Sequence, residues 1–133
     1  MFNPFNSIAD LSAPTKLYIL DITLYSGMQV CMIAPTNLSQ KDFVIDFVST
    51  IFDKFNKTPR VFVGHSMLYS DKLFNALLAY FVDYKYTSKH YTFTNCFYVP
   101  LKDIIDAVDT FALSGKFEGK YVPQNDSDNY LPF

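Results

Sequence analysis

Apolar residues follow two spacings along this chain, a period of two and a helical period, and each change of spacing marks a new element. Residues 17–25 are apolar on both faces, which predicts a strand in the interior of a sheet. Ser26 and Gly27 suit a tight turn, after which residues 28–34 return as a second strand that Pro35 ends. The pattern therefore predicts a hairpin at the start of the folded region.

Two stretches then carry apolar residues at helical spacing. The first covers residues 39–56 and opens on Ser39 and Asp42, which resemble a capping box. The second covers residues 71–86 and follows a cap at Ser70 or Asp71. The core-facing positions expected in these helices are Phe43, Val44, Phe47, Val48, Ile51, Phe52, Phe55, Leu73, Phe74, Leu77, Leu78, Phe81 and Tyr84.

Two more strands are predicted between the helices. Residues 60–63 form a short apolar run, typical of a buried central strand, which Gly64 breaks before a loop over residues 65–69. Residues 90–99 alternate an apolar face with a mixed one, as a strand near a sheet edge does.

A last helix over residues 101–112 begins after Pro100 and ends before Gly115. The element order is therefore β-β-α-β-α-β-α. Because the later strands alternate with helices, we expect parallel additions to the hairpin, giving a mixed sheet of about four strands with helices packed on it. The fold class is α/β, with a single domain over residues 15–117.

Both ends of the chain lack periodicity and are interpreted as extended arms, residues 1–14 and 118–133. Each arm nevertheless carries large apolar side chains, which are the predicted binding residues: Phe2, Phe5, Tyr121, Tyr130, Leu131 and Phe133. We expect the arms to associate with a protein partner or with another copy of the chain. The alternative is that both arms fold back on their own domain and cover a sheet edge.

Charge and composition exclude several classes of function. The net charge of −2 and the single arginine, Arg60, argue against phosphate clamps and steering of a polyanion. No glycine-rich phosphate loop is present. Residues 85–95 mix lysines with aromatic residues, a pattern found in single-strand binders, so a nucleic-acid partner stays open. The bias toward Lys, Asn, Tyr and Phe suits an AT-rich coding sequence, such as many viruses, phages and mobile elements have.

The two cysteines, Cys31 and Cys96, form no CxxC pair and lie within apolar strand patterns. We interpret them as buried free thiols in a reducing compartment. No secretory signal and no apolar run of membrane-spanning length is evident, so no membrane partner is expected. The predicted location is cytoplasmic or intracellular, in the host cell or the virion if the source is viral.

Three residues are candidates for chemistry. His65 is predicted at the carboxyl end of the central strand, facing a crevice, where it could act as a base for the neighbouring Ser66. The alternative is a loop histidine that hydrogen-bonds backbone. Asp21 is a lone carboxylate in a buried strand and a candidate metal ligand. Its alternative is a buried acid hydrogen-bonded to a loop.

Tyr-Ile-Leu-Asp-Ile-Thr at residues 18–23 resembles the first-strand motif of the integrase core of retroviruses and transposons, an RNase H-like fold. The stretch from Pro59 to residue 74 resembles the second motif of that family. The resemblance implies a metal-dependent nucleic-acid enzyme that uses Asp21 and Mg²⁺. This chain has no carboxylate near Gly64 or His65, where the family places its second one.

Because the catalytic acids of that family are incomplete here, the first hypothesis is a non-catalytic interaction or assembly protein of viral, phage or mobile-element origin, without a cofactor. It is supported by the apolar anchors in both arms and by the abundance of Tyr and Phe. The alternative is a small metal-dependent nuclease or integrase-like enzyme of RNase H-like ancestry.

Overall fold

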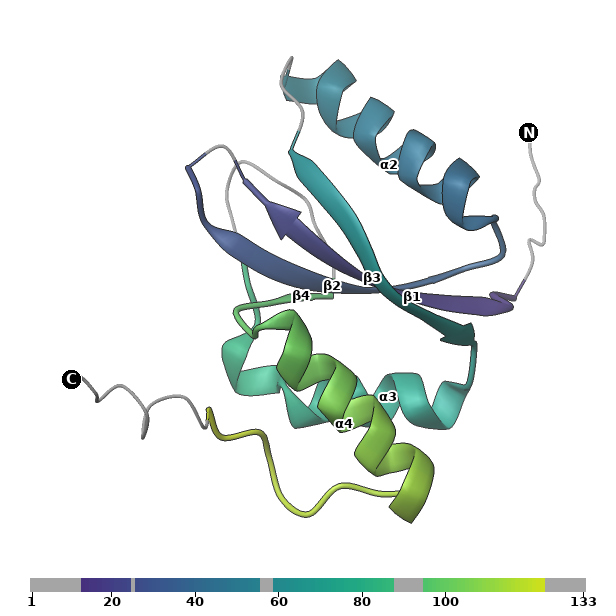
Figure 1. The fold of residues 1–133 in the computed structure, drawn as a ribbon, viewed down its shortest axis with the longest axis vertical. Helices are drawn as coiled ribbons and strands as arrows, with labels where there is room; N and C mark the ends of the chain where they lie inside the picture. The colour runs from purple at the N-terminus through teal and green to yellow at the C-terminus, as the bar shows by residue number, and fades with distance from the viewer. Residues whose placement is uncertain (1–12, 25, 56–58, 88–94, 124–133) are drawn as a thin grey trace.

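Strand β1 (Lys16–Thr23) lies inside a four-stranded sheet that separates two groups of helices (Figure 1). The computed structural model describes residues 13–24, 26–55, 59–87 and 95–123. Within these ranges the predicted order of strands and helices is confirmed. The elements that follow β1 are β2 (Gln29–Thr36), α2 (Gln40–Phe55), β3 (Arg60–Leu68), α3 (Asp71–Tyr80), the 3-10 turn η2 (Val82–Tyr84), β4 (Cys96–Phe97) and α4 (Leu101–Ser114).

The sheet is antiparallel, so the prediction of a mixed sheet with parallel additions is wrong. The strand order is β3-β1-β2-β4, and each neighbouring pair is antiparallel. The crossover through α2 does bring β3 back in the same direction as β2. However, β1 lies between these two strands and pairs with both, which makes every contact in the sheet antiparallel.

Strand β3 differs most from its prediction. It is an edge strand rather than a central one, and it continues past Gly64 to Leu68. Its pairing with β1 shifts by one residue, from Ile19 opposite His65 to Leu20 opposite Val63, so Gly64 is the extra residue of a β-bulge. A Cβ at Gly64 would lie 2.4 Å from a methyl carbon of Leu101 in α4. Glycine thus allows α4 to approach the strand closely without ending it.

The sheet buries a separate core on each face. Helix α2 covers one face, and α3 and α4 cover the other (Figure 1). Because successive side chains of a strand alternate, β1 contributes Leu17 and Ile19 to the core of α3 and α4 and Tyr18, Leu20 and Ile22 to the core on the side of α2. Of the helices in the described ranges, none has the length and apolar character needed to cross a membrane.

The predicted helix caps are confirmed. The Ser39 hydroxyl accepts from the backbone N–H of Asp42 at 3.2 Å, and the Ser70 hydroxyl accepts from that of Leu73 at 3.2 Å. Gly115 ends α4 in the left-handed conformation, with φ of 77°.

Some element boundaries differ from the prediction. Strand β2 does not stop at Pro35, because this residue pairs with Leu17 and the strand ends at Thr36. The helix predicted over residues 71–86 ends at Tyr80 and continues as the turn η2. Of the strand predicted at residues 90–99, only Cys96–Phe97 is a strand, and residues 88–94 lie outside the described residues.

The chain after α4 packs on the domain as far as it is described. Tyr121 is buried in the core, and its backbone N–H donates to the carbonyl of Tyr80 at 2.9 Å. Its ring contacts those of Phe81 and Tyr84. We call residues 115–122 the C-terminal strap. The packing of Tyr121 supports the alternative prediction, in which the C-terminal arm folds back on its own domain.

Leu77→Ala should reduce the free energy of unfolding by roughly 2–5 kcal/mol, because it removes a fully buried side chain and leaves a cavity. Phe47→Ala should reduce the free energy of unfolding by less than a Phe→Ala substitution at a fully buried position would. The reason is that the Phe47 side chain on α2 is only half-buried. Chemical denaturation of each variant measures the change.

The matched control is Leu113→Ala on α4, where the leucine is 91% exposed. Its effect should stay within about 0.5 kcal/mol. Equal losses for Leu77→Ala and Leu113→Ala would contradict the assignment of the core face of α3.

Candidate functional site

His65 and Ser66 do not form a catalytic pair. Both lie in the middle of β3, where neighbouring side chains point to opposite faces of the sheet. His65 lies opposite Ile19 and is half-buried on the side of α3 and α4, whereas Ser66 lies opposite Tyr18 and is exposed. The prediction that His65 sits at the carboxyl end of a central strand is wrong, because Gly64 forms a bulge instead of ending the strand.

Asp21 lies at the mouth of an open cavity of about 370 Å³. It is partly exposed, and it pairs with Cys31 of β2 on one side and Phe62 of β3 on the other. The cavity is also lined by Tyr98 and by the start of α4 at Leu101. Asp21 and the first residue of α4 therefore border the same cavity.

A single carboxylate at a cavity mouth is a weak metal site. Within the described ranges, no three His, Cys, Asp or Glu side chains lie close enough together to hold a metal ion. Asp21 alone offers at most two ligand oxygens, whereas a hard cation such as Mg²⁺ takes six. The chemistry that Asp21 can perform without further ligands is to accept hydrogen bonds from a molecule in the cavity.

Cys31 and Cys96 are free and buried, as predicted. They lie on adjacent strands, but Cys31 belongs to the core under α3 and α4 and Cys96 to the core on the opposite face. Burial, with the charge of Asp21 as the next cause, raises the pKa of Cys31 from 9.0 to about 12. Burial likewise raises the pKa of Cys96 to about 12. Both thiols are therefore protonated and poor nucleophiles near neutral pH.

Most of the predicted binding residues fall outside the described part of the chain. Phe2 and Phe5 precede it, and Tyr130, Leu131 and Phe133 follow it. Tyr121 is described, and its hydroxyl donates to the carboxylate of Asp103 while its ring lies in the core. Of the lysine-containing stretch at residues 85–95, residues 88–94 also lie outside the described residues.

A groove of about 410 Å³ lies between α3, the end of α4 and the C-terminal strap. Tyr80, Phe111 and Phe117 form its aromatic wall, and Lys72, Lys116 and Lys120 line it as well. We call it the lysine-rimmed groove. Aromatic and cationic groups at one concave surface can bind a segment that carries both apolar and acidic side chains.

Sequence reasoning missed this groove because its parts come from three separate stretches. Lys72 belongs to α3, whereas Lys116 and Lys120 belong to a stretch without any periodicity. The available signal was the pair of glycines, Gly115 and Gly119, which both adopt positive φ and turn the strap back over α3.

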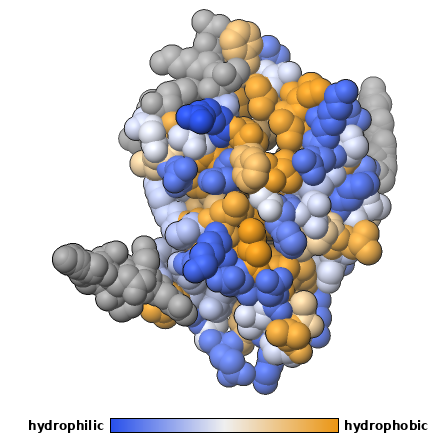
Figure 2. Space-filling view, in the orientation of Figure 1, coloured by the Kyte–Doolittle hydropathy of each residue, from blue (hydrophilic) through white to orange (hydrophobic). Residues whose placement is uncertain are grey.

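The outer edge of β3 is the second feature that the sequence did not reveal. In the part of the chain that the structure describes, β3 pairs with β1 alone. Two large apolar side chains stand beside this edge, Phe62 at 64% exposure and Leu68 at 83%. Figure 2 shows hydrophobic residues gathered across the middle of the face on which β3 lies in front of the other strands. An edge of this kind can add a further strand.

Comparisons of the chain with protein-family models, with curated proteins and with solved structures found no match.

The two thiols should make stability fall at alkaline pH. Above pH 9 an unfolded chain loses its thiol protons, whereas the native chain keeps them until about pH 12. Unfolding is therefore favoured as the pH rises through this window, by up to about 1.4 kcal/mol per pH unit for each thiol. Urea denaturation between pH 8 and pH 11 measures this slope.

Tyrosines and lysines titrate in the same window, so the slope is assigned by comparison with Cys31→Ala. This variant removes one thiol and loses a fixed amount of packing energy that does not depend on pH. Its stability should fall less steeply than that of the wild type above pH 9. Parallel pH profiles for the two proteins would contradict the raised pKa of Cys31.

Proposed function

We propose that this protein is a non-catalytic interaction or assembly protein that associates through the outer edge of β3, where a second copy of the chain adds its own β3. The composition of the chain, with its bias toward Lys, Asn, Tyr and Phe, supports a viral, phage or mobile-element source. The protonated, buried state of both cysteines is compatible with action in a reducing, intracellular compartment.

The observation that carries this proposal is the combination of a nine-residue edge strand with two exposed apolar side chains. Edge strands usually carry charges, prolines or a cover that prevents pairing with another chain. In β3 the one charged residue is Arg60, at the start of the strand. Phe62 and Leu68 lie on opposite faces of the sheet, so an added strand would find apolar surface on both sides.

A two-fold symmetric pairing fits this edge. Antiparallel addition of β3 to β3 makes the interface self-complementary, as in most homodimers. The sheet would then run continuously through both copies. Main-chain hydrogen bonds would supply much of the affinity, and the contacts of Phe62 and Leu68 would supply the specificity.

The alternative of a metal-dependent nucleic-acid enzyme rests on Asp21, which faces a cavity, and on the resemblance of residues 18–23 to the integrase core. It predicts Mg²⁺-dependent cleavage of DNA or RNA by the purified protein. Cleavage that disappears in Asp21→Asn would favour this enzyme over the assembly protein. Equal background activity in the two proteins would reject it.

Phe62→Lys combined with Leu68→Lys should remove the self-association that runs through β3. Both side chains are largely exposed, so the fold is retained, while like charges from two copies would meet across the interface. Light scattering should give the wild type a mass above the 15.3 kDa of one chain, and the variant a lower average mass than the wild type at the same concentration.

Leu113→Lys is the matched control, because it places the same charge at an exposed apolar residue on α4, away from β3. It should associate as the wild type does. A wild type that stays monomeric over the whole concentration range, or a Phe62 and Leu68 variant that associates normally, would refute strand addition at β3.

A further inference from the structure

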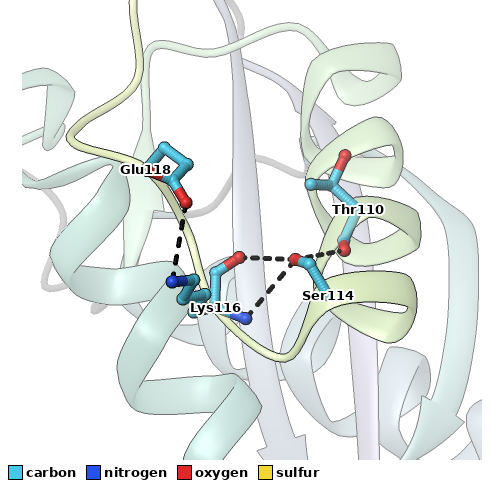
Figure 3. Close-up of polar contacts among 4 residues, drawn as sticks. All are labelled: Thr110, Ser114, Lys116 and Glu118. Carbon is cyan, nitrogen blue, oxygen red and sulfur yellow. Dashed lines mark hydrogen bonds and ion pairs between the residues drawn. The ribbon is translucent and has the colours of Figure 1, made fainter.

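The lysine-rimmed groove is a built surface, because the C-terminal strap that forms one wall is held at both ends. Its start is tied to α4 by Ser114, whose hydroxyl lies 2.9 Å from the carbonyl oxygen of Thr110 and 2.8 Å from that of Lys116 (Figure 3). Lys116 also pairs with Glu118 at 3.7 Å (Figure 3). The other end is held by the burial of Tyr121.

Between these two ends, Phe117 fixes the aromatic wall. Its ring stacks on Tyr80, with centroids 4.2 Å apart and planes at 14°. It also meets the ring of Phe111 at 5.4 Å. On the opposite side, α3 presents Ala76 and Ala79, whose small side chains leave the groove open. The inner surface of the groove, its floor, is therefore apolar and accessible.

The rim of the groove is cationic. Lys116 and Lys120 have carboxylate partners, Glu118 and Asp83, in ion pairs of 3.7 and 3.8 Å that are exposed to solvent and therefore weak. Lys72 pairs with no carboxylate within the described part of the chain. An occupant that brings apolar side chains to the floor and carboxylates to the rim would satisfy both parts of this surface.

Residues 124–133 have this chemistry. Their sequence, Gln-Asn-Asp-Ser-Asp-Asn-Tyr-Leu-Pro-Phe, contains two carboxylates, no cation, and three large apolar residues at its end. The segment begins directly after Pro123, at the end of the strap. It lies outside the described residues, whereas the groove that matches its charge and hydrophobicity is fully described.

The path of the strap favours a groove on another copy. Val122 lines a different cavity, on the side of α4, together with Asp103 and Asp106. The described chain thus leaves the strap beside two carboxylates, whereas Lys72, Lys116 and Lys120 line the other cavity.

We propose that residues 124–133 of one copy bind in the lysine-rimmed groove of a second copy, with Asp126 and Asp128 at the lysines and Tyr130, Leu131 and Phe133 on the aromatic floor. This inference deepens the proposed function and rests on its premise that the chain self-associates, although not on strand addition at β3. It names a second interface, which does not involve β3.

Charge reversal in the full-length chain tests this exchange. Lys72→Glu with Lys116→Glu should weaken association by about tenfold or more, and Asp126→Lys with Asp128→Lys should do the same. Combining all four substitutions should restore association to within about threefold of the wild type, because the charges are complementary again. Sedimentation and light scattering over a concentration series give the dissociation constants.

The control variant is Lys41→Glu with Lys102→Glu, which makes the same charge change in the first turns of α2 and α4, where an acidic residue is tolerated. It should associate as the wild type does. Normal association of the groove variant or the tail variant, or failure of the combined variant to recover, would overturn the exchange. A third outcome would also overturn the proposal. If the wild type is monomeric, and the tail and groove variants change only the hydrogen-exchange protection of the Tyr80 and Phe117 amides, the segment binds in the groove of its own chain.

The two interfaces are separable in the same measurements. If the Phe62 and Leu68 variant and the groove variant each weaken association, both interfaces stand. If the Phe62 and Leu68 variant associates normally while the groove variant dissociates, the exchange stands and strand addition fails. If the Phe62 and Leu68 variant dissociates while the groove variant associates normally, strand addition stands and the exchange is overturned.

Discussion

Strand β1 constrains the whole molecule, because it is paired on both edges and covered on both faces. It pairs along its length with β2 and, through the bulge, with β3, so its backbone polar groups are satisfied within the sheet. Its side chains are divided between two cores, with Ile19 in one and Leu20 in the other. A shift of one residue would exchange the cores and bring Asp21 under α2, at the cost of burying a charge. Asp21 thus helps to specify the register, independently of any role in binding.

The bulge in β3 allows the strand to keep this pairing with β1 while α4 packs closely against it. Without the extra residue, the side chains after Gly64 would face the wrong side of the sheet, and with any other residue a Cβ would collide with Leu101. The same irregularity separates His65 from the end of the strand. One close contact between a strand and a helix therefore accounts both for the approach of α4 to β3 and for the position of His65 inside the strand rather than at its end.

Local signals predicted the local structure well. The caps at Ser39 and Ser70 and the end of α4 at Gly115 depend on contacts within a few residues, and the sequence carries them directly. The position of β3 beside β1 depends on a choice between two sheet edges, which periodicity does not encode. Gly64 was ambiguous for a physical reason, since glycine serves both to end a strand and to form a bulge. The lysine-rimmed groove could not be predicted from the sequence, because α3 and the aperiodic C-terminal strap form it together and only the fold brings them into contact.

The bulge also has a consequence for how this chain behaves at high concentration. Fibrils of stacked strands require a flat segment of about six or seven residues with unbroken alternation. In β3 the alternation reverses at Gly64, which leaves residues 60–63 and 65–68 as two short runs on either side of the bulge. Such an edge can complete one pairing but offers a poor template for indefinite growth. In the strand addition proposed above, the bulge that accommodates α4 therefore favours a finite pair over an amyloid, in a strand whose exposed phenylalanine and leucine would otherwise favour the latter.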